Sequence, residues 1–414
     1  MHSLRLALPP ELVDLILDHF FDDDPTLIAC SLTCRMWGAR TRRCIFRTVT
    51  LKDAEDYLTF EGLLKESPDL GSCVRNLAIG SCDQSGWFNQ KTPRIKNLPN
   101  VNYLSIKSWS ATDMSHDIRV NLPVLLATVK FLRLDGVIIS KEDLLHLLRA
   151  SPRLSTLALT RFFAVRDDPE PATSSTARAI GVDSLKCDPS SGCSLMACLS
   201  RASVRVCIRK LEIKGLALAD SLVLIKELVH AAGAHVEELT FSLLGSVELC
   251  PSAWQECTDV ENFPRLTSLH IRSHYFPQTR HVAGPPLDNI PFLLSRIKPV
   301  HTRLEKVTIS IEAFQVFAVP PAFYPSRCMD WSRLDQSLSN NAQDRPHLEV
   351  IFQICCPGDV PDRTFEAMVE VITGCLPMLR AMKTRLGVVC GTRWFDYPTF
   401  HGDFVDPVLQ RWFS

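Results

Sequence analysis

A frame of three apolar residues, spaced apolar–x–x–apolar–x–apolar, recurs through most of this 414-residue chain. The first copy consists of Val74, Leu77 and Ile79. The intervals between the first seven copies are 27, 28, 25, 28, 26 and 28 residues, and the later intervals lengthen to 30, 38 and 44. A regular period of this length predicts stacked strand–helix units that share one elongated core. The copies begin at Val74, Val101, Val129, Leu154, Val182, Ile208, Val236, Leu266, Leu304 and, with only Ile351 to complete it, Leu348.

The segments between the copies carry helix signals, which a unit of this length requires. Ser140 precedes the apolar stripe of residues 141–148, and Ser at this place favours a helix N-cap. Asp220 starts a similar stripe, and Gly233 follows it where a helix C-cap is expected. Residues 365–372 form a further apolar stripe. Each unit is therefore predicted to contain one strand and one helix.

Three segments between the copies are rich in proline and polar residues, which favours loops. These segments are residues 166–179, 273–291 and 313–345. The long spacings after Leu266 are therefore interpreted as inserted loops.

The repeats resemble the leucine-rich-repeat family, with one clear departure. That family usually has Asn or Cys three positions after the last frame residue, where the side chain bonds the backbone of the bend. Here one unit has Cys82 at this position, but other units have apolar residues. The units are therefore degenerate, and a regular horseshoe is not expected. The apolar substitutes are Trp109, Val137, Phe162 and Leu216.

The first 51 residues have a different pattern, which predicts three helices and an exit strand. Two prolines lie at the start of the first predicted helical segment, residues 8–20, where proline is tolerated because its missing N–H is not needed in a first turn. Two shorter helices fit residues 26–33 and 34–45, and an alternating strand fits residues 46–51. Within the third helix, Met36 and Trp37 are expected to point inward. Three helices of this size bury little surface, and such a unit usually keeps apolar surface for a partner.

Residues 8–47 contain Leu-Pro, an acidic residue, paired aliphatics, a Leu-x-x-Cys-Ser-Leu-x-Cys-x-x-Trp stretch and a Phe-Arg exit. The residues that carry this pattern are Leu8, Pro9, Glu11, Ile16, Leu17, Leu27, Cys30, Ser31, Leu32, Cys34, Trp37, Phe46 and Arg47. The pattern, which covers about an eighth of the chain, resembles the F-box family. The stretch at residues 30–37 looks like that of the F-box proteins abundant in mushroom-forming fungi.

The resemblance implies docking onto the Skp-family adaptor, which links F-box modules to a cullin scaffold and a RING subunit in a ubiquitin ligase. Leu12, Leu32 and Phe20 are expected to pack inside the module, whereas Pro9 and Ile16 are expected at the interface. Trp37 fits either role. The contact candidates that the resemblance implies are Leu8, Pro9, Glu11, Ile16, Leu17, Leu27, Ser31, Cys34 and Trp37.

Composition and motifs favour a protein-binding role over catalysis. The net charge is −1, so no global field attracts nucleic acid or an anionic membrane. No GxGxxG, GxxxxGK[ST] or GxSxG string occurs, and the 16 cysteines form no CxxC pair. His270 and His274 lack the Glu of an HExxH site, so we predict no metal and no cofactor. The chain shows no secretory signal and no long apolar segment, which predicts an intracellular protein.

Two further groups of residues have a structural and a binding interpretation. The basic stripe is expected to be a solvated helix face balanced by residues 22–24, and not a nucleic-acid site. The C-terminal aromatic residues are expected to cap the open end of the repeats, with contact to a bound protein as the alternative. The stripe is Arg35, Arg40, Arg42, Arg43 and Arg47, and the aromatic residues are Trp394, Phe395, Tyr397, Phe400, Phe404, Trp412 and Phe413.

The sequence therefore predicts an α/β protein with a small three-helix F-box over residues 1–51 and an irregular leucine-rich-repeat-like α/β solenoid over residues 52–414. The expected function is that of a non-catalytic substrate-recognition adaptor that binds an unknown target protein through its repeats. The main alternative is a repeat scaffold with no ligase role. A hydrolase built on the repeats is the less favoured alternative, and it requires a deep polar pocket.

Overall fold

The computed structural model describes residues 8–20, 23–80, 98–111, 116–165, 181–201, 207–214, 219–244, 262–275, 289–313, 329–356, 362–392 and 409–413. Within these residues the protein is mixed α/β, with 12 α-helices and a large set of mostly parallel strands. The chain divides into two compact units, Met1–Gly181 and Val182–Ser414. None of the helices in the described ranges has the length and apolar character that crossing a membrane requires.

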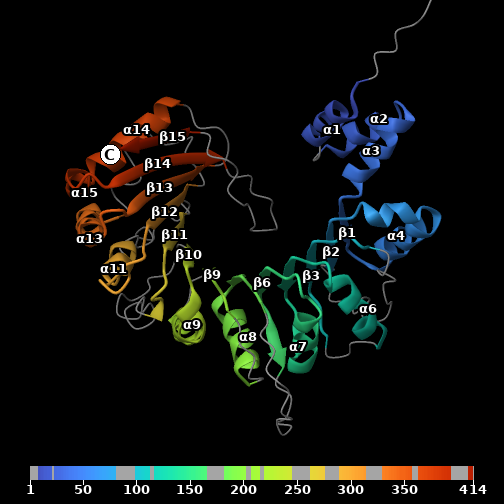
Figure 1. Cartoon of the computed structure of the whole chain (residues 1–414), viewed down its shortest axis with the longest axis horizontal. Coiled ribbons are helices and arrows are strands. Elements are labelled where there is room, and N and C mark those ends of the chain that lie inside the picture. The colour runs from blue at the N-terminus through green and yellow to red at the C-terminus, as the bar shows by residue number, and fades with distance from the viewer. Residues whose placement is uncertain are drawn as a thin grey trace, which may run out of the picture. The chain divides into compact units, whose positions relative to one another are not determined.

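The first unit begins with a three-helix module and continues as strands and helices in alternation (Figure 1). Its elements are α1 (Pro10–His19), α2 (Asp24–Ser31), α3 (Arg35–Ile45), β1 (Thr48–Leu51), α4 (Ala54–Glu66), the 3-10 turn η1 (Pro68–Ser72), β2 (Asn76–Gly80), β3 (Tyr103–Lys107), α6 (His116–Leu126), β4 (Phe131–Asp135), β5 (Ile138–Ser140), α7 (Lys141–Arg149), β6 (Thr156–Thr160) and β7 (Phe163–Val165).

The strands of the first unit pair in the order β1-β2-β3-β4-β6, all parallel. Helices α4, α6 and α7 lie on one side of these strands (Figure 1). The frame residues stay in register from strand to strand, since Val49 pairs with Leu77 and Leu77 pairs with Leu104. The exit strand β1 is therefore the first strand of the sheet, and the three-helix module continues directly into the repeats.

The second unit repeats the same arrangement with longer strands. Its elements are β8 (Ser184–Cys187), α8 (Pro189–Arg201), β9 (Lys210–Ile213), α9 (Ala219–Ala232), the 3-10 turn η3 (Gly233–His235), β10 (Glu238–Leu244), β11 (Ser268–Tyr275), α11 (Asn289–Ser295), β12 (Lys306–Ala313), α13 (Trp331–Asp344), β13 (Glu349–Cys356), α14 (Asp362–Gly374), α15 (Pro377–Ala381), β14 (Arg385–Thr392) and β15 (Leu409–Phe413). Strands β8 to β14 are parallel and pair in chain order, and β15 adds antiparallel to β14.

Most of the predicted elements are confirmed. The Ser140 hydroxyl accepts a hydrogen bond of 3.1 Å from the backbone N–H of Asp143 and caps α7 as expected. Helix α9 ends at Ala232, so Gly233 follows it as predicted. In all nine complete frames the second and third residues fall on a strand and the first lies just before it, and all of these side chains are buried.

Two predictions about the repeats need correction, and one repeat strand was missed. In the tenth unit Val350 pairs with Val307 and Phe352 pairs with Ile309, so these two residues, and not Ile351, hold the frame positions. An eleventh strand, β14, was not predicted. Residues 331–344 form helix α13, although that region was expected to be a loop. The apolar pattern that would have predicted this helix is weak, because α13 carries many polar residues. Several of these are buried and donate hydrogen bonds to backbone carbonyl groups.

At the bends after the strands, apolar side chains take the place of the expected Asn. Trp109, Val137 and Phe162 are buried, whereas Cys82 and Leu216 lie outside the described residues. Beside these bends β5 and β7 form a small parallel sheet of their own. Packing of apolar side chains therefore holds the bends in the first unit. The predicted loop at residues 166–179 lies outside the described ranges, as do residues 276–288 of the predicted loop at residues 273–291. The described ends of the second loop belong to β11 and α11, so its predicted bounds were too wide.

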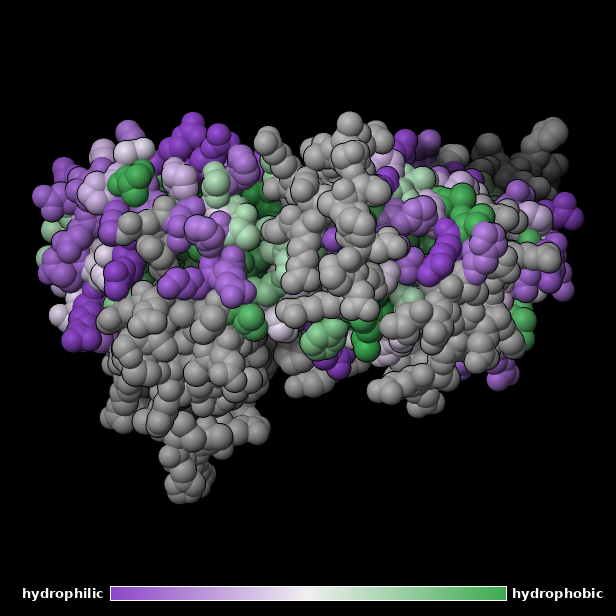
Figure 2. Space-filling view, turned by 90° about the horizontal axis from the view of Figure 1, so that it is seen from below, coloured by the Kyte–Doolittle hydropathy of each residue, from purple (hydrophilic) through white to green (hydrophobic). Residues whose placement is uncertain are grey.

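Figure 2 shows one outer side of the molecule by hydropathy. Hydrophilic residues predominate there, and hydrophobic residues form small separate groups among them. This pattern follows from the fold, because each helix turns its apolar stripe toward the strands.

Candidate functional site

The three-helix module has a small interior and an exposed apolar exterior. Its core consists of Val13, Leu17 and Leu27, which are fully buried. Partly buried residues pack against this core, and they are Phe20, Cys30, Trp37, Cys44 and Ile45. Leu17 and Leu27 therefore support the module from inside. This corrects their assignment to the contact surface, because neither side chain reaches the surface of the module.

Helix α1 presents a second apolar stripe beside the stripe that faces the core. Leu12 and Ile16 on this helix, and Leu8 just before it, recur at four-residue spacing, and all three are exposed. Leu15 is 66% exposed on the same side of the helix. The prediction that Leu12 packs inside is wrong. The buried residues of this helix are Val13, which follows Leu12, and Leu17, which follows Ile16.

Helices α2 and α3 add further exposed apolar residues. Ile28 is exposed on α2, and Leu32 at its C-terminal cap is 82% exposed, although we expected Leu32 to be internal. Met36 on α3 is exposed as well, whereas we expected it to point inward. The signal that could have found these residues was present in the sequence. A module of this size has more large apolar residues than its core can hold.

The remaining candidates lie at helix ends. The carbonyl oxygen of Pro9 accepts hydrogen bonds from the N–H groups of Leu12 (3.1 Å) and Val13 (3.2 Å), and Glu11 is exposed in the first turn of α1. The Ser31 hydroxyl donates to the carbonyl oxygen of Ile28 at 2.6 Å. Cys34 is exposed immediately before α3.

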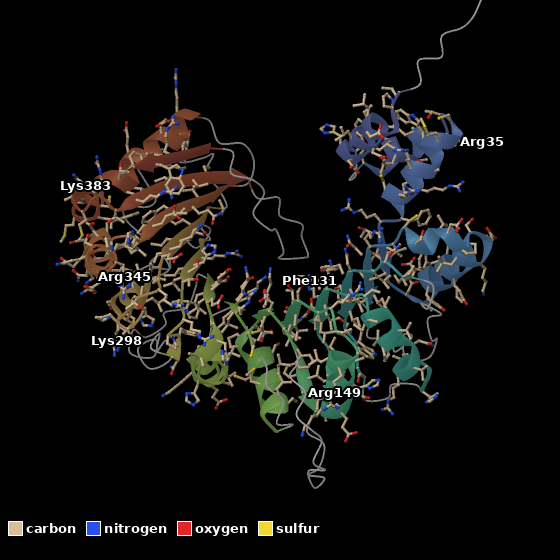
Figure 3. The ribbon with its side chains drawn as sticks, viewed as in Figure 1. Arg35, Phe131, Arg149, Lys298, Arg345 and Lys383 are labelled. Carbon is tan, nitrogen blue, oxygen red and sulfur yellow. The ribbon has the colours of Figure 1, made fainter. Side chains whose placement is uncertain are left out.

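One residue of the basic stripe pairs with an acidic residue outside the expected segment 22–24. Arg40 forms an ion pair with Asp14, which ties α3 to α1. Asp23 instead caps α2. Its carboxylate accepts hydrogen bonds from the Thr26 hydroxyl at 2.6 Å and from the Thr26 N–H at 3.1 Å, and these two bonds lower the pKa of the Asp23 carboxyl. Arg35, labelled in Figure 3, is exposed on the module. The exposed cations and the exposed apolar residues therefore belong to the same small module.

On the strand face of the first unit, aromatic and charged side chains gather on β3, β4 and the residue after β6. Tyr103 and Phe131 stack with their ring centroids 4.8 Å apart. Asp135 accepts from Arg133 at 3.2 Å and from Arg161 at 2.7 Å. Figure 3 places Phe131 on the strand side of this unit.

On the strand face of the second unit, three cations surround one buried carboxylate. Glu212 Oε1 lies 3.2 Å from Arg272 Nη1 and 3.5 Å from Lys214 Nζ, and its Oε2 lies 3.5 Å from Lys186 Nζ. Burial raises the pKa of Glu212, but the three cations lower it by more, so the pKa is below its ordinary value. Burial also lowers the pKa of Lys214. The carboxylate thus holds the three cations in place.

His270 takes part in a hydrogen-bonded chain on this strand face. Its Nε2 lies 2.6 Å from the Ser310 Oγ, and Ser310 donates to Gln353 Oε1 at 2.6 Å. The side chain of His274 lies outside the described residues. Within the described ranges, no group of three or more His, Cys, Asp or Glu residues is placed to hold a metal ion.

A hollow in the second unit lies where β12, β13 and β14 begin, with Glu305, Glu349 and Arg385 in its lining. Arg345 borders it and is itself buried (Figure 3). Its guanidinium donates to the carbonyl oxygens of His301 at 2.9 Å and Lys298 at 2.5 Å. Arg345 therefore fixes the chain before β12 to the end of α13, which is a structural role.

The aromatic C-terminus is partly described. Trp412 and Phe413 lie on β15, which covers the edge of β14. The Arg385 guanidinium lies over the Trp412 ring, 4.3 Å from its centroid. This placement agrees with the expected capping role for these two residues. Trp394, Phe395, Tyr397, Phe400 and Phe404 lie outside the described residues.

No family model matches the sequence, and no curated protein matches it either.

Proposed function

We propose that this chain is the substrate-recognition adaptor of a Skp–cullin–F-box type ubiquitin ligase, with its F-box in residues 1–51 and its target-binding repeats in residues 52–414. The observation that carries the proposal is the concentration of exposed apolar side chains on the three-helix module. Of the 18 large hydrophobic residues exposed in the described chain, seven lie between Leu8 and Met36. Apolar surface of this density on a module with a three-residue core favours a partner protein.

The proposed docking surface consists of exposed or partly buried side chains. It keeps Leu8, Pro9, Glu11 and Ile16 from the sequence candidates, with Cys34 and the partly buried Ser31 and Trp37 beside them. Leu17 and Leu27 act from the core. We add Leu12, Leu15, Ile28, Leu32 and Met36 to the proposed surface, because their side chains are exposed on the same module.

The parallel repeats support the second half of the proposal. Strand β1 follows the three-helix module directly in the chain and pairs with β2, so backbone hydrogen bonds tie the module to the first strands of the sheet. An adaptor of this kind catalyses no bond change itself. It raises the local concentration of a bound target near the charged ubiquitin carrier, which is an effective-molarity effect.

Co-purification with a Skp-family adaptor tests the proposal. The wild-type chain is expected to retain the adaptor, and the double variant Pro9→Ala plus Ile16→Asp is expected to lose it, because a carboxylate would be buried in the apolar contact. Ile16 is exposed in the free chain, so its change should leave folding intact.

Leu58→Asp is the matched control. Leu58 is also an exposed leucine on a helix, but it lies on α4 and not on the three-helix module. The control is expected to bind the adaptor like the wild type. If the wild type fails to bind, or the double variant binds equally well, the chain is better described as a repeat scaffold without a ligase role.

A further inference from the structure

A row of exposed cations follows the edge of the first unit at which its strands begin. Arg47 directly precedes β1, Arg75 directly precedes β2 and Lys130 directly precedes β4. All three side chains are exposed, so their charged groups are open to a ligand. Phe131, which is labelled in Figure 3, comes next in the chain after Lys130 and shows where the row lies.

Backbone hydrogen bonds align this row, one residue for each strand. The carbonyl oxygen of Arg47 accepts from the N–H of Arg75 at 2.9 Å, and that of Arg75 accepts from the N–H of Asn102 at 2.9 Å. Asn102 in turn accepts from Lys130 at 2.8 Å, and Lys130 accepts from Ser155 at 2.9 Å. Neighbouring strands are about 4.8 Å apart, so Arg47 and Arg75 are close neighbours of like charge.

Little negative charge balances this row in the first unit. None of its cations forms an ion pair within the part of the chain that the structure describes. The described segments that lead into β1, β2, β3, β4 and β6 contain four cations and one acidic residue. The row therefore has a surplus of positive charge. The cations are Arg47, Arg75, Lys130 and Arg153, and the acidic residue is Asp69.

The second unit shows the same positions with their charges balanced. Arg209 directly precedes β9, and its Nε lies 2.5 Å from the carboxylate of Asp183, which directly precedes β8. One residue later, Lys210 pairs with its register partner Glu238 at 2.9 Å. In the second unit a carboxylate on the neighbouring strand thus compensates a cation at the start of a strand. The exposed row of the first unit has no such carboxylate beside it.

This uncompensated charge selects the chemistry of a ligand. Like charges on neighbouring strands repel one another, and an anion that lies along the row relieves the repulsion. A nucleic acid is the less suitable anion, because four cations neutralise few of its phosphates. The whole chain also carries a net charge of −1, so the residues outside the row are negative in sum and do not attract a long polyanion. The carboxylates of a short acidic protein segment fit the row better.

We propose that this row binds a short acidic segment of a partner protein, with Asp or Glu side chains placed against Arg47, Arg75 and Lys130. The row spans three strand spacings, or about 14 Å, and five extended residues cover about 13 Å with three side chains on one side. Calling the partner a degradation target rests on the proposed function, whereas binding of the acidic segment does not.

Fluorescence anisotropy of the full-length chain tests the proposal with labelled nine-residue Gly/Ser peptides. The probe carries Glu at three alternate positions, and its controls carry Gln or Lys at the same positions. At low salt the Glu peptide is expected to bind about tenfold more tightly than the Gln peptide, because three exposed charge pairs each contribute a little. The difference should shrink as added salt screens these pairs.

Variants at the row locate the site. Arg75→Gln plus Lys130→Gln should weaken binding of the Glu peptide about tenfold, and Lys130→Gln alone should weaken it several-fold. Lys52→Gln is the matched control for the single change. Lys52 is exposed directly after β1, at the opposite end of that strand from Arg47, and its change should alter binding less than twofold.

A charge reversal separates binding from a structural role. Arg75→Glu plus Lys130→Glu should reverse the preference, so that the Lys peptide binds more tightly than the Glu peptide. The unfolding midpoint of this variant should not fall below that of the wild type, because it replaces repulsion between Arg47 and Arg75 by attraction.

Several outcomes would overturn the proposal. They are equal binding of the Glu and Gln peptides, equal weakening by Lys52→Gln and Lys130→Gln, and no change of preference on charge reversal. Tighter binding of a labelled oligothymidylate than of the Glu peptide, lost in the double Gln variant, would assign the row to nucleic acid instead. Failure to bind a Skp-family adaptor would remove the proposed function and leave the peptide result standing, and adaptor binding with no peptide binding would do the reverse.

Discussion

Gly387 on β14 faces the indole ring of Trp412 on β15, and a Cβ atom at Gly387 would lie 2.7 Å from Cζ3 of that ring. The two residues are also register partners in the antiparallel pairing of β14 with β15. The absence of a side chain at one position therefore permits an aromatic residue to cover the edge of the parallel strands. This relationship joins the end of the chain to the last repeat.

Gly387→Ala should destabilise the protein. The added methyl group forces either the ring or strand β15 away, which costs about 1–3 kcal/mol. Urea unfolding followed by tryptophan fluorescence measures this loss. Gly62→Ala is the control, because Gly62 lies inside α4 with no atom within 4 Å of its would-be Cβ, and this change should stabilise by about 0.5–1 kcal/mol. Equal stability of wild type and Gly387→Ala would contradict the packing described here.

The distinction between core and surface leucines of the three-helix module is testable in the same way. Leu17→Ala opens a cavity in a core of three residues and should cost about 2–5 kcal/mol. Leu12→Ala removes an exposed side chain from the same helix and should cost less than about 0.5 kcal/mol. Circular dichroism during thermal unfolding compares the two. A larger loss from Leu12→Ala would mean that Leu12 packs inside the module after all.

A buried carboxylate on α13 should be needed for the docking of α15. The two oxygens of Asp335 accept 2.9 Å hydrogen bonds from the backbone N–H groups of Met378 and Leu379. Asp335→Ala leaves both donors unpaired in the interior and should cost about 2–4 kcal/mol. Hydrogen–deuterium exchange at Met378 and Leu379 should accelerate in the variant. Asp344→Ala, which changes an exposed residue of the same helix, should leave that exchange unaltered.

The Glu212 cluster predicts a pH dependence with a definite sign. Because the folded pKa of Glu212 lies below the unfolded value of about 4.3, its contribution to stability is fully present above that pH. The contribution is lost as the pH falls through the lower, folded pKa. Glu212→Gln should therefore destabilise by about 2 kcal/mol at pH 7, and the difference from wild type should shrink below pH 4.

Unfolding midpoints in denaturant from pH 7 to pH 3 measure this dependence. Glu66→Gln is the control, since Glu66 is exposed at the end of α4, and its stability difference should stay below about 0.5 kcal/mol at every pH. A difference for Glu212→Gln that does not vary with pH would show that the carboxylate is not the source of the stabilisation.

The sequence by itself determined where the repeated strands lie and where most helices begin. The frame from Val74 to Ile309 and the cap at Ser140 are local signals, and each depends only on spacing of a few residues. The same holds for the three helices of the N-terminal module. Local spacing is enough for such features because strand alternation, helix period and capping are set by near neighbours along the chain.

Tertiary structure alone decided which of several apolar residues face inward. Leu12 and Leu17 look alike in sequence, but only the packing of α1 against α3 buries one and exposes the other. Strand pairing puts Val350 and Phe352, and not Ile351, at the frame positions of the tenth unit. It also brought Arg161 to Asp135, which lies in the preceding repeat. Such relationships depend on residues about 25 or more positions apart, and one sequence holds no local signal for them.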